Sequence, residues 1–303
     1  MTGGGILKTD KRLTEVYKKA RIEYFDENSK YIFFSDCHRG NGSHSDEFTK
    51  NQNIYIHALR YYYERGFTYV EVGDGDELWE HPKATYIKNA HYEVFELIKK
   101  YHLDKRLIMI YGNHNIYLKD PSYVKKHYYT YYNSYTKETK DFLYGLKPVE
   151  GLVLKNKNSN QEIFVVHGHQ GDFSNDQLWY PTMLSLKYFW RYLHAFGIKN
   201  PASPIKNTIK RHRIEKNISK WIKKHSKMVI CAHTHRFKYP RSKELPYFNT
   251  GCCIYPTTIT GIEFDKGIIN VVRWKIKTDN DGILNVNRKI IRGPDPVEKF
   301  DIS

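Results

Sequence analysis

The stretch YIFFSDCHRG, residues 31–40, decides how the rest of the chain is interpreted. It is an apolar run that ends in a carboxylate and an imidazole two residues apart, Asp36 and His38. The apolar run predicts a buried strand, and open α/β sheets keep their sites at the carboxyl ends of their strands. Alone, the Asp-x-His pair is more typical of a turn with a solvated histidine than of a metal site. It becomes informative because later apolar runs end in the same kinds of residue.

Four further apolar runs are followed by polar residues that can bind metal. The runs are residues 67–72, 106–111, 162–166 and 228–232, and they lead to Asp74, Asn113, His167, and His233 with His235. Helical patterns at about 46–65 and 86–101 separate the first three runs. Strands that alternate with helices pair in parallel through right-handed crossovers, which places their carboxyl ends on one rim of the sheet. We therefore expect the polar side chains to converge.

The seven converging residues are Asp36, His38, Asp74, Asn113, His167, His233 and His235. Seven ligands exceed what one ion needs. With Asp74 shared, they divide into two sites of the kind that two-metal hydrolases use, with the ions about 3.5–4 Å apart. The first site would use Asp36, His38, Asp74 and His235, and the second Asp74, Asn113, His167 and His233. The competing interpretation is a set of unrelated loop residues.

The donor set also limits the metal. Mixed nitrogen and oxygen ligands without thiolate suit two divalent or trivalent ions of the borderline class. We expect Mn first, with Fe, Zn, Co or Ni as alternatives that the donors do not rank.

In this order, the motifs resemble the signature blocks of the calcineurin-like metallophosphoesterase superfamily across residues 31–265. The blocks are Asp36-x-His38, Gly73-Asp74-x-x-Glu77, Gly112-Asn113-His114, His167-Gly168 and Ala232-His233-Thr234-His235. A narrower resemblance, to the UDP-2,3-diacylglucosamine pyrophosphatase-like branch, is carried by 34–38, 77–79, 167–172 and 248–251. The resemblance implies an α/β fold, a four-layer α/β/β/α sandwich with an inserted helical lid.

The domain organisation expected from these motifs has three parts. Residues 1–30 would be an N-terminal helical extension, 31–275 the metallophosphoesterase domain and 276–303 a C-terminal strand and tail. The lid would be residues 173–226, where helical patterns at about 178–196 and 205–225 are separated by the breaker NPASP.

The resemblance also implies roles for residues beside the ligands. A hydroxide bridging the two ions would be the nucleophile, and His114 would protonate the leaving oxygen or bind the transition state. Asn115 stands where the family usually has an acid, so we expect it to hold His114 in one tautomer without stabilising an imidazolium. Arg39 stands where the branch commonly has leucine, and we expect a fixed cation for substrate phosphate, with an ion pair to a neighbouring acid as the alternative. His169 and Asn113 are expected substrate contacts, and His169 could instead orient a ligand.

Composition points to an anionic partner. The 303-residue chain has 49 Lys and Arg against 33 Asp and Glu, a formal charge of +16. A phosphorylated substrate is therefore expected, and nucleic acid is a second candidate because tyrosine and lysine are interleaved. A lipid-linked pyrophosphate is a further candidate, because the large apolar residues of 178–196 suggest an apolar groove between lid and core, and peripheral membrane contact is a related expectation. The oligomeric state is not predictable from these features.

The cysteine spacing suggests a reducing compartment, and the hydropathy pattern suggests a protein without a membrane span. The four cysteines have no Cys-x-x-Cys spacing, and no apolar run approaches the roughly 20 residues that span a bilayer. We therefore expect a cytoplasmic protein, and the resemblance implies a manganese-dependent metallophosphoesterase acting as a phosphatase, phosphodiesterase or pyrophosphatase. The alternatives are a nuclease or nucleic-acid-end phosphatase on the same core, and a catalytically weakened binding or scaffold protein.

Overall fold

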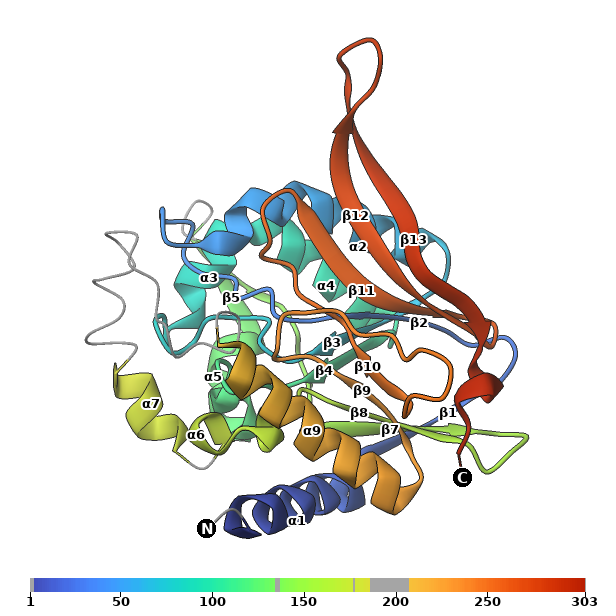
Figure 1. Ribbon diagram of the computed structural model, residues 1–303. Coiled ribbons are helices and arrows are strands. Elements are labelled where there is room, and N and C mark those ends of the chain that lie inside the picture. Colours follow the sequence, from blue (N-terminus) through green and yellow to red (C-terminus); the bar gives the residue numbers. More distant parts are fainter. Residues whose placement is uncertain (1–2, 134–136, 177, 186–206, 303) are drawn as a thin grey trace.

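The computed structural model describes residues 3–133, 137–176, 178–185 and 207–302. Within them, two large β-sheets face each other, and helices cover both outer faces (Figure 1). A small separate hairpin is formed by β5 (Thr130–Asn133) and β6 (Glu138–Asp141).

The first sheet has six strands in the order β13-β12-β11-β2-β3-β4. Their bounds are β2 (Lys30–Phe34), β3 (Thr68–Val72), β4 (Leu107–Ile110), β11 (Thr258–Asp265), β12 (Ile268–Thr278) and β13 (Leu284–Pro296). The strands β2, β3 and β4 pair in parallel, as the alternation of strands and helices predicts, whereas β11, β12 and β13 are antiparallel.

The second sheet has five strands in the order β1-β7-β8-β9-β10. Their bounds are β1 (Arg21–Phe25), β7 (Gly151–Asn156), β8 (Glu162–Val166), β9 (Met228–Cys231) and β10 (Tyr247–Asn249). The strands β8, β9 and β10 pair in parallel, so β8 and β9 end on the same side.

Helices form the two outer layers. The first sheet is covered by α2 (Gln52–Glu64), α3 (Ala84–Ala90), α4 (Tyr92–Leu103) and α5 (Pro121–Tyr128). The second is covered by α1 (Gly3–Lys19) and α9 (Thr208–His225). Shorter helices are η1 (Glu47–Asn51), η2 (Ile116–Lys119), η3 (His169–Gly171), α6 (Phe173–Asp176), α7 (Trp179–Ser185) and η5 (Val297–Phe300).

Three apolar cores hold these layers together. Phe33, Val70 and Ile230 belong to the core between the sheets, Leu59 to the core beneath α2, and Trp221 to the core beneath α9. Burying apolar side chains on both faces of each sheet is the main stabilising term for such a sandwich. The predicted four-layer α/β/β/α architecture is confirmed.

Some segments differ from the expectation. Residues 21–25 form the edge strand β1 of the second sheet, so the segment 1–30 is more than a helical extension. The helix α9 packs on the second sheet through Ile218, Trp221 and Ile222, which makes it part of an outer layer. Residues 186–206, in the first predicted helix of the lid and the breaker, lie outside the described part of the chain.

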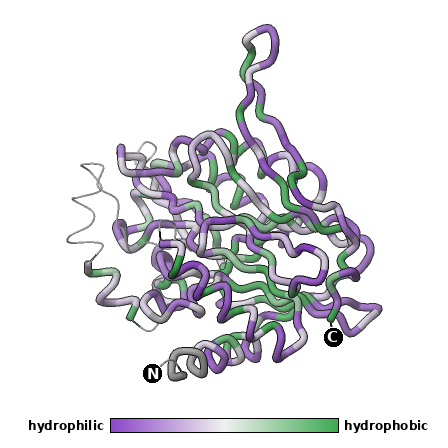
Figure 2. The backbone as a smooth tube through the Cα atoms, viewed as in Figure 1, coloured by the Kyte–Doolittle hydropathy of each residue, from purple (hydrophilic) through white to green (hydrophobic). Residues whose placement is uncertain are grey.

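The C-terminal strand β13 takes up 13 residues of the segment 276–303, for which the sequence predicts a strand and tail. The strands β12 and β13 pair over most of their length and project beyond the body as a hairpin (Figure 1). Figure 2 shows long hydrophilic stretches on this hairpin, in contrast to the strands in the middle of the molecule. Within the described residues, no helix is long and apolar enough to cross a membrane.

Candidate metal centre

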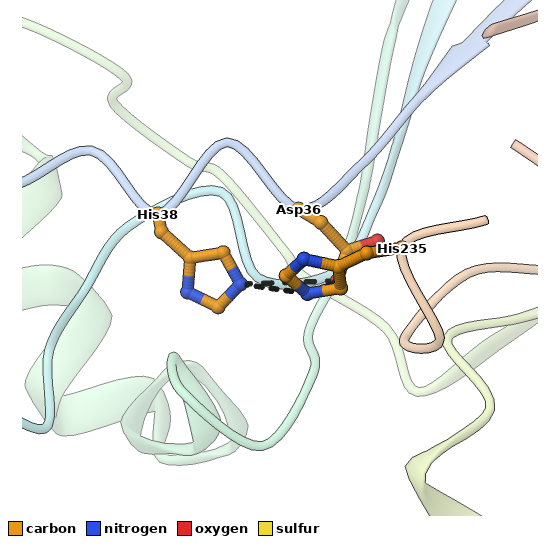
Figure 3. Close-up of side chains that lie close together, drawn as sticks. All are labelled: Asp36, His38 and His235. Atoms are coloured by element: carbon orange, nitrogen blue, oxygen red, sulfur yellow. Dashed lines mark hydrogen bonds and ion pairs between the residues drawn. The ribbon is translucent and has the colours of Figure 1, made fainter. Parts of the chain in front are cut away.

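The carboxyl ends of β2, β3, β8 and β9 bring the predicted ligands together in two clusters. Asp36, His38 and His235 form one, and Asp74, His167 and His233 form the other. In each cluster, one ligand atom from every residue lies within 4.8 Å of the others. The first cluster is shown in Figure 3. The membership of each cluster matches the division into two sites that the sequence predicts.

Asp74, a member of the second cluster, also faces the first cluster. Its Oδ2 is 3.0 Å from His167 Nε2 and 4.0 Å from His38 Nε2. Its Oδ1 accepts a hydrogen bond from the backbone N–H of His114 at 2.8 Å. One carboxylate oxygen is therefore fixed by the backbone while the other faces both clusters, as a shared ligand requires.

The carboxylate of Asp36 is held in the same way. Its Oδ2 accepts hydrogen bonds from Ser35 Oγ at 2.6 Å and from the backbone N–H of His233 at 3.1 Å. Its Oδ1 lies 3.1 Å from His235 Nε2 without hydrogen-bond geometry. Burial favours a raised pKa for Asp36, but His235 and His167 outweigh it and hold the pKa at about 2. Asp36 is thus an ionised, buried carboxylate with one oxygen directed at imidazole rings.

The histidines are oriented through their second ring nitrogen. His167 Nδ1 lies 2.9 Å from the carbonyl oxygen of Val72, and His38 Nδ1 lies 3.1 Å from Glu77 Oε2. These contacts leave each Nε2 facing the cluster. Metal-binding histidines use this arrangement, since the outer hydrogen bond fixes the tautomer and the ring plane.

The backbone at the rim is unusual. Asp36, His38, Asp74, His233 and His235 all have φ between 46° and 66°. Non-glycine residues seldom adopt this left-handed region, and its cost is accepted where the surrounding structure needs a side chain in one particular direction. Five of the six clustered residues share this conformation, so the strand ends turn specifically to aim these side chains inward.

Two glycines make room for the clusters. A Cβ atom on Gly112 would collide with Asp74 Oδ1, and one on Gly73 with His167 Nδ1. The glycines of the motifs Gly73-Asp74 and Gly112-Asn113 are therefore explained by close approach of the backbone to the ligands.

Asn113 also reaches this rim. It is fully buried, and neither its Oδ1 nor its Nδ2 has a hydrogen-bond partner within the described residues. A buried side-chain amide without partners is costly, so such a group indicates a site that another species completes. The expected ligand role of Asn113 stays a prediction.

Asn115 does not orient His114. Its Oδ1 accepts a hydrogen bond from the backbone N–H of Gly112 at 2.6 Å, so the side chain stabilises the loop. The residue that holds His114 is Glu77, whose Oε2 lies 2.7 Å from His114 Nδ1. Burial would lower the pKa of His114, but Glu77 and Asp74 raise it to about 9. The expectation that no carboxylate supports His114 is therefore corrected.

Glu77 is the functional residue that the sequence-based site did not include. Its position three residues after Asp74 was visible in the motif Gly73-Asp74-x-x-Glu77, and that was the available signal. It contacts both His38 and His114, and the indole of Trp79 stacks on the His114 ring with 4.3 Å between centroids. The ring of His114, the candidate for proton transfer, is thereby held by Glu77 at its edge and by Trp79 on one face.

Arg39 does not reach the rim. Its side chain is fully buried, with Nη1 2.8 Å from Glu71 Oε2 and Nε 2.6 Å from Asp76 Oδ1. The guanidinium also lies 5.2 Å from the ring centroid of Phe95. The expectation that Arg39 binds substrate phosphate is wrong, because both its charge and its donors are already used inside the protein.

His169 lies just outside the second cluster. It is buried, its ring centroid is 5.5 Å from that of His167, and neither ring nitrogen has a hydrogen-bond partner among the described residues. Burial, followed by the neighbouring His167 and His233, lowers its pKa well below the usual value. It is a neutral imidazole beside the centre, and its substrate-binding role remains a prediction.

Asp172 connects the centre to α9. Its Oδ2 lies 3.4 Å from His233 Nε2 and 2.9 Å from Lys210 Nζ, at the start of that helix. The N-terminal turn of α9 therefore approaches the rim, although most of the helix covers the second sheet.

The comparisons with known proteins found likenesses among solved structures. No family model and no curated protein matches the chain. A conserved uncharacterized protein from Streptococcus pneumoniae TIGR4, described as a predicted phosphoesterase, is similar with a TM-score of 0.36 and 11% identity, over 86% of this chain and 97% of that one. Vps29 from Chaetomium thermophilum has a TM-score of 0.35 and 9% identity over 88% and 99%.

A third similar structure is a putative 5′-nucleotidase from Staphylococcus aureus, solved in complex with alpha-ketoglutarate. Its TM-score is 0.35 with 16% identity, over 88% of this chain and 55% of that one. Scores of this size carry no inference about function, which must be argued from the site itself.

Proposed function

We propose that this chain is a metal-dependent hydrolase of phosphoric esters or anhydrides with a dinuclear metal centre. The observation that carries the proposal is the pair of clusters that meet at Asp74. Carboxylate, imidazole and amide groups from separate strand ends are gathered at one buried point, where several of them lack hydrogen-bond partners within the described residues.

The residues present fit two ions. Asp36 Oδ1, His167 Nε2 and Asn113 Oδ1 are buried and lack hydrogen-bond partners within the described chain. Asp36, His38 and His235 would hold one ion and Asn113, His167 and His233 the other, with Asp74 shared. When bound, such ions supply Lewis acidity that activates water and neutralises phosphoryl charge. Mn remains our first expectation among the metals that these donors accept.

The chain's own residues supply proton transfer. His114 is bonded to Glu77 through Nδ1, which leaves Nε2 to carry a proton toward the leaving oxygen of the substrate. The carboxylate of Glu77 stabilises the imidazolium form and holds the ring in place. Trp79 packs against the ring and excludes water from one face. His114 is therefore the general acid of the proposed reaction.

The substrate class follows from charge and from the narrower resemblance. Similarity to the UDP-2,3-diacylglucosamine pyrophosphatase-like branch favours a phosphodiester or pyrophosphate over a monoester. The formal charge of +16 fits any anionic phosphorylated substrate.

We propose a reducing, cytoplasmic setting because the four cysteines are free and buried.

The proposal is tested by metal loading and a substrate panel. The purified chain is loaded separately with Mn, Co, Ni, Zn or Mg, its metal content is measured by elemental analysis, and hydrolysis of p-nitrophenyl phosphate, bis-p-nitrophenyl phosphate and a nucleoside diphosphate sugar is followed. We expect about two ions per chain and hydrolysis with at least one borderline metal. Near-zero metal together with no hydrolysis after Mn loading would favour a scaffold protein on a degenerate fold.

A further inference from the structure

A cavity of about 580 Å³ opens directly beside the first cluster. His235 forms part of its wall, and three cationic residues, Arg236, Arg273 and Lys275, also line it. The rest of the lining is Phe237, Tyr255, Thr257, Thr258 and Thr260. A substrate whose reacting phosphorus lies at the rim could therefore extend into a positively charged space.

The basic wall continues onto the projecting hairpin. Arg273 on β12 is paired in register with Lys289 on β13, and Lys275 and Lys277 follow at alternate positions. Side chains at alternate positions and in register lie on the same face of a sheet. These four cations and the cavity thus belong to one continuous face, which we call the basic track.

The two faces of the hairpin differ in how their charges are used. On the opposite face, Arg288 is bonded to Glu263 at 3.0 Å, and Trp274 packs in the core near α2. On the basic track, no carboxylate partner occurs for Arg273, Lys275, Lys277 or Lys289 in the described part of the chain. Arg273 Nε is moreover buried without a hydrogen-bond partner there. Unpaired cations beside a cavity indicate a surface that receives anions.

We propose that the basic track binds a single-stranded nucleic acid and leads its phosphodiester backbone into the metal rim. The proposal rests on the proposed function, since the phosphate that reacts would lie beside His235. Side chains two residues apart on a strand recur about every 6.7 Å, a spacing suited to successive phosphates of an extended chain. The exposed ring of Tyr255 is placed to stack on a base at the cavity.

The composition of the hairpin tip is unfavourable for binding of the basic track to an anionic membrane. Ile283 and Leu284 are exposed there, but Asp279 and Asp281 lie in the same turn, and their charge would be repelled by anionic lipid. The net cationic part of the hairpin is the strand region that adjoins the cavity. A polyanion lying along the strands would contact these cationic side chains, whereas a membrane into which the hairpin tip inserts would not.

The test compares two triple variants with the same net charge. The track variant is K275Q/K277Q/K289Q, and the control is K216Q/K220Q/K223Q on the exposed side of α9, where each lysine is solvated. Binding of a fluorescein-labelled 12-nucleotide single-stranded DNA is measured by anisotropy in the metal-free proteins between 50 and 300 mM NaCl. Binding is thereby separated from catalysis.

We expect the track variant to bind at least about tenfold more weakly than wild type. Its slope of log K against log salt should be shallower by about 2, since each phosphate contact in a single strand contributes about 0.7. The control should match wild type. Equal losses in both variants, or no binding by wild type at 50 mM NaCl, would overturn the proposal.

Two further measurements separate the competing explanations. Hydrolysis of bis-p-nitrophenyl phosphate by metal-loaded wild type tests the proposed function alone, so hydrolysis without DNA binding rejects only the basic track. DNA binding without any hydrolysis rejects only the enzyme. Sedimentation with vesicles containing phosphatidylglycerol tests the membrane: binding to vesicles that is tighter than to DNA, and is lost in the track variant, would assign this surface to lipid and contradict the proposal.

Discussion

The segment 36–39 contributes to two buried polar regions that contrast sharply. Asp36 and His38 belong to the metal rim, where several nitrogen and oxygen atoms have no hydrogen-bond partner among the described residues. Arg39, the next residue, belongs to an ion cluster in which its guanidinium is paired with both Glu71 and Asp76. Tyr128 and Tyr69 add hydroxyl donors to the two carboxylates, at 2.6 and 2.8 Å.

The contrast separates two uses of buried charge. An ion cluster whose charges are paired with one another stabilises the fold only while all its members are present. Removal of one member leaves a buried charge without its partner, which is unfavourable. A rim of directed but unpaired donors is unfavourable until something binds. Substitutions in the ion cluster around Arg39 should therefore change folding stability, and substitutions in the metal rim should change metal content and catalysis.

The largest effect is expected for Asp74→Asn. The substitution removes the charge of the shared ligand while keeping its shape, so both ions should be lost and hydrolysis should fall by about three orders of magnitude or more. Elemental analysis and the rate with bis-p-nitrophenyl phosphate measure these effects. Comparable turnover in a metal-loaded Asp74→Asn protein would show that the clusters do not share this carboxylate.

A smaller and purely catalytic effect is expected for His114→Ala. Loss of the general acid should lower kcat by about 10²–10⁴ while leaving the metal content at the wild-type value. The loss should be much smaller for a substrate with a good leaving group such as p-nitrophenolate than for an alkyl ester. An equal loss with both leaving groups would argue against proton donation by His114.

Arg39→Met should act on stability instead. It leaves Glu71 and Asp76 buried without their cation, and breaking a buried ion pair in this way costs about 3–5 kcal/mol of unfolding free energy. Urea denaturation of the metal-free protein measures this cost. KM for the folded variant should stay near the wild-type value, and a large rise in KM at unchanged stability would restore a substrate-binding role for Arg39.

Glu77→Gln is expected to have the mildest effect. The amide retains the size of the side chain but no longer stabilises the His114 imidazolium, and loss of a carboxylate that orients histidines costs about 10–100-fold in activity or metal affinity. The pKa of His114, followed by NMR in the metal-free protein, should fall from its raised value. An unchanged pKa would mean that Glu77 does not set it.

Much of the fold and of the rim could be predicted from the sequence. Buried parallel strands are near-continuous apolar runs, and their polar ends must meet on one edge of their sheet, so the sequence groups Asp36 with Asp74 and His167 with His233. The strand β1 was not predicted because Arg21–Phe25 is a half-exposed edge strand with a charged composition. The packing of α9 depends on a tertiary contact that periodicity alone does not define.

The error about Arg39 has a specific cause. The isolated bridge between Arg39 and Asp76 shows that pairing of the two strands continues beyond β2 and β3, so alternate side chains still face opposite sides although Asp36 and His38 have positive φ. Asp36 and His38 therefore point to the rim, while Cys37 and Arg39 point to the opposite side. The buried acid Glu71 inside the apolar strand β3 was the second signal, since such a carboxylate requires a partner.

The central claim is that the two clusters hold two ions joined by Asp74. It is tested most directly by a crystal structure of the Mn-loaded protein with anomalous data collected near the Mn absorption edge. Our account predicts two anomalous peaks on opposite sides of Asp74 Oδ2, one beside Asp36, His38 and His235 and the other beside His167 and His233. The absence of anomalous density at this rim in Mn-saturated crystals, or a lone peak that does not contact Asp74, would contradict it.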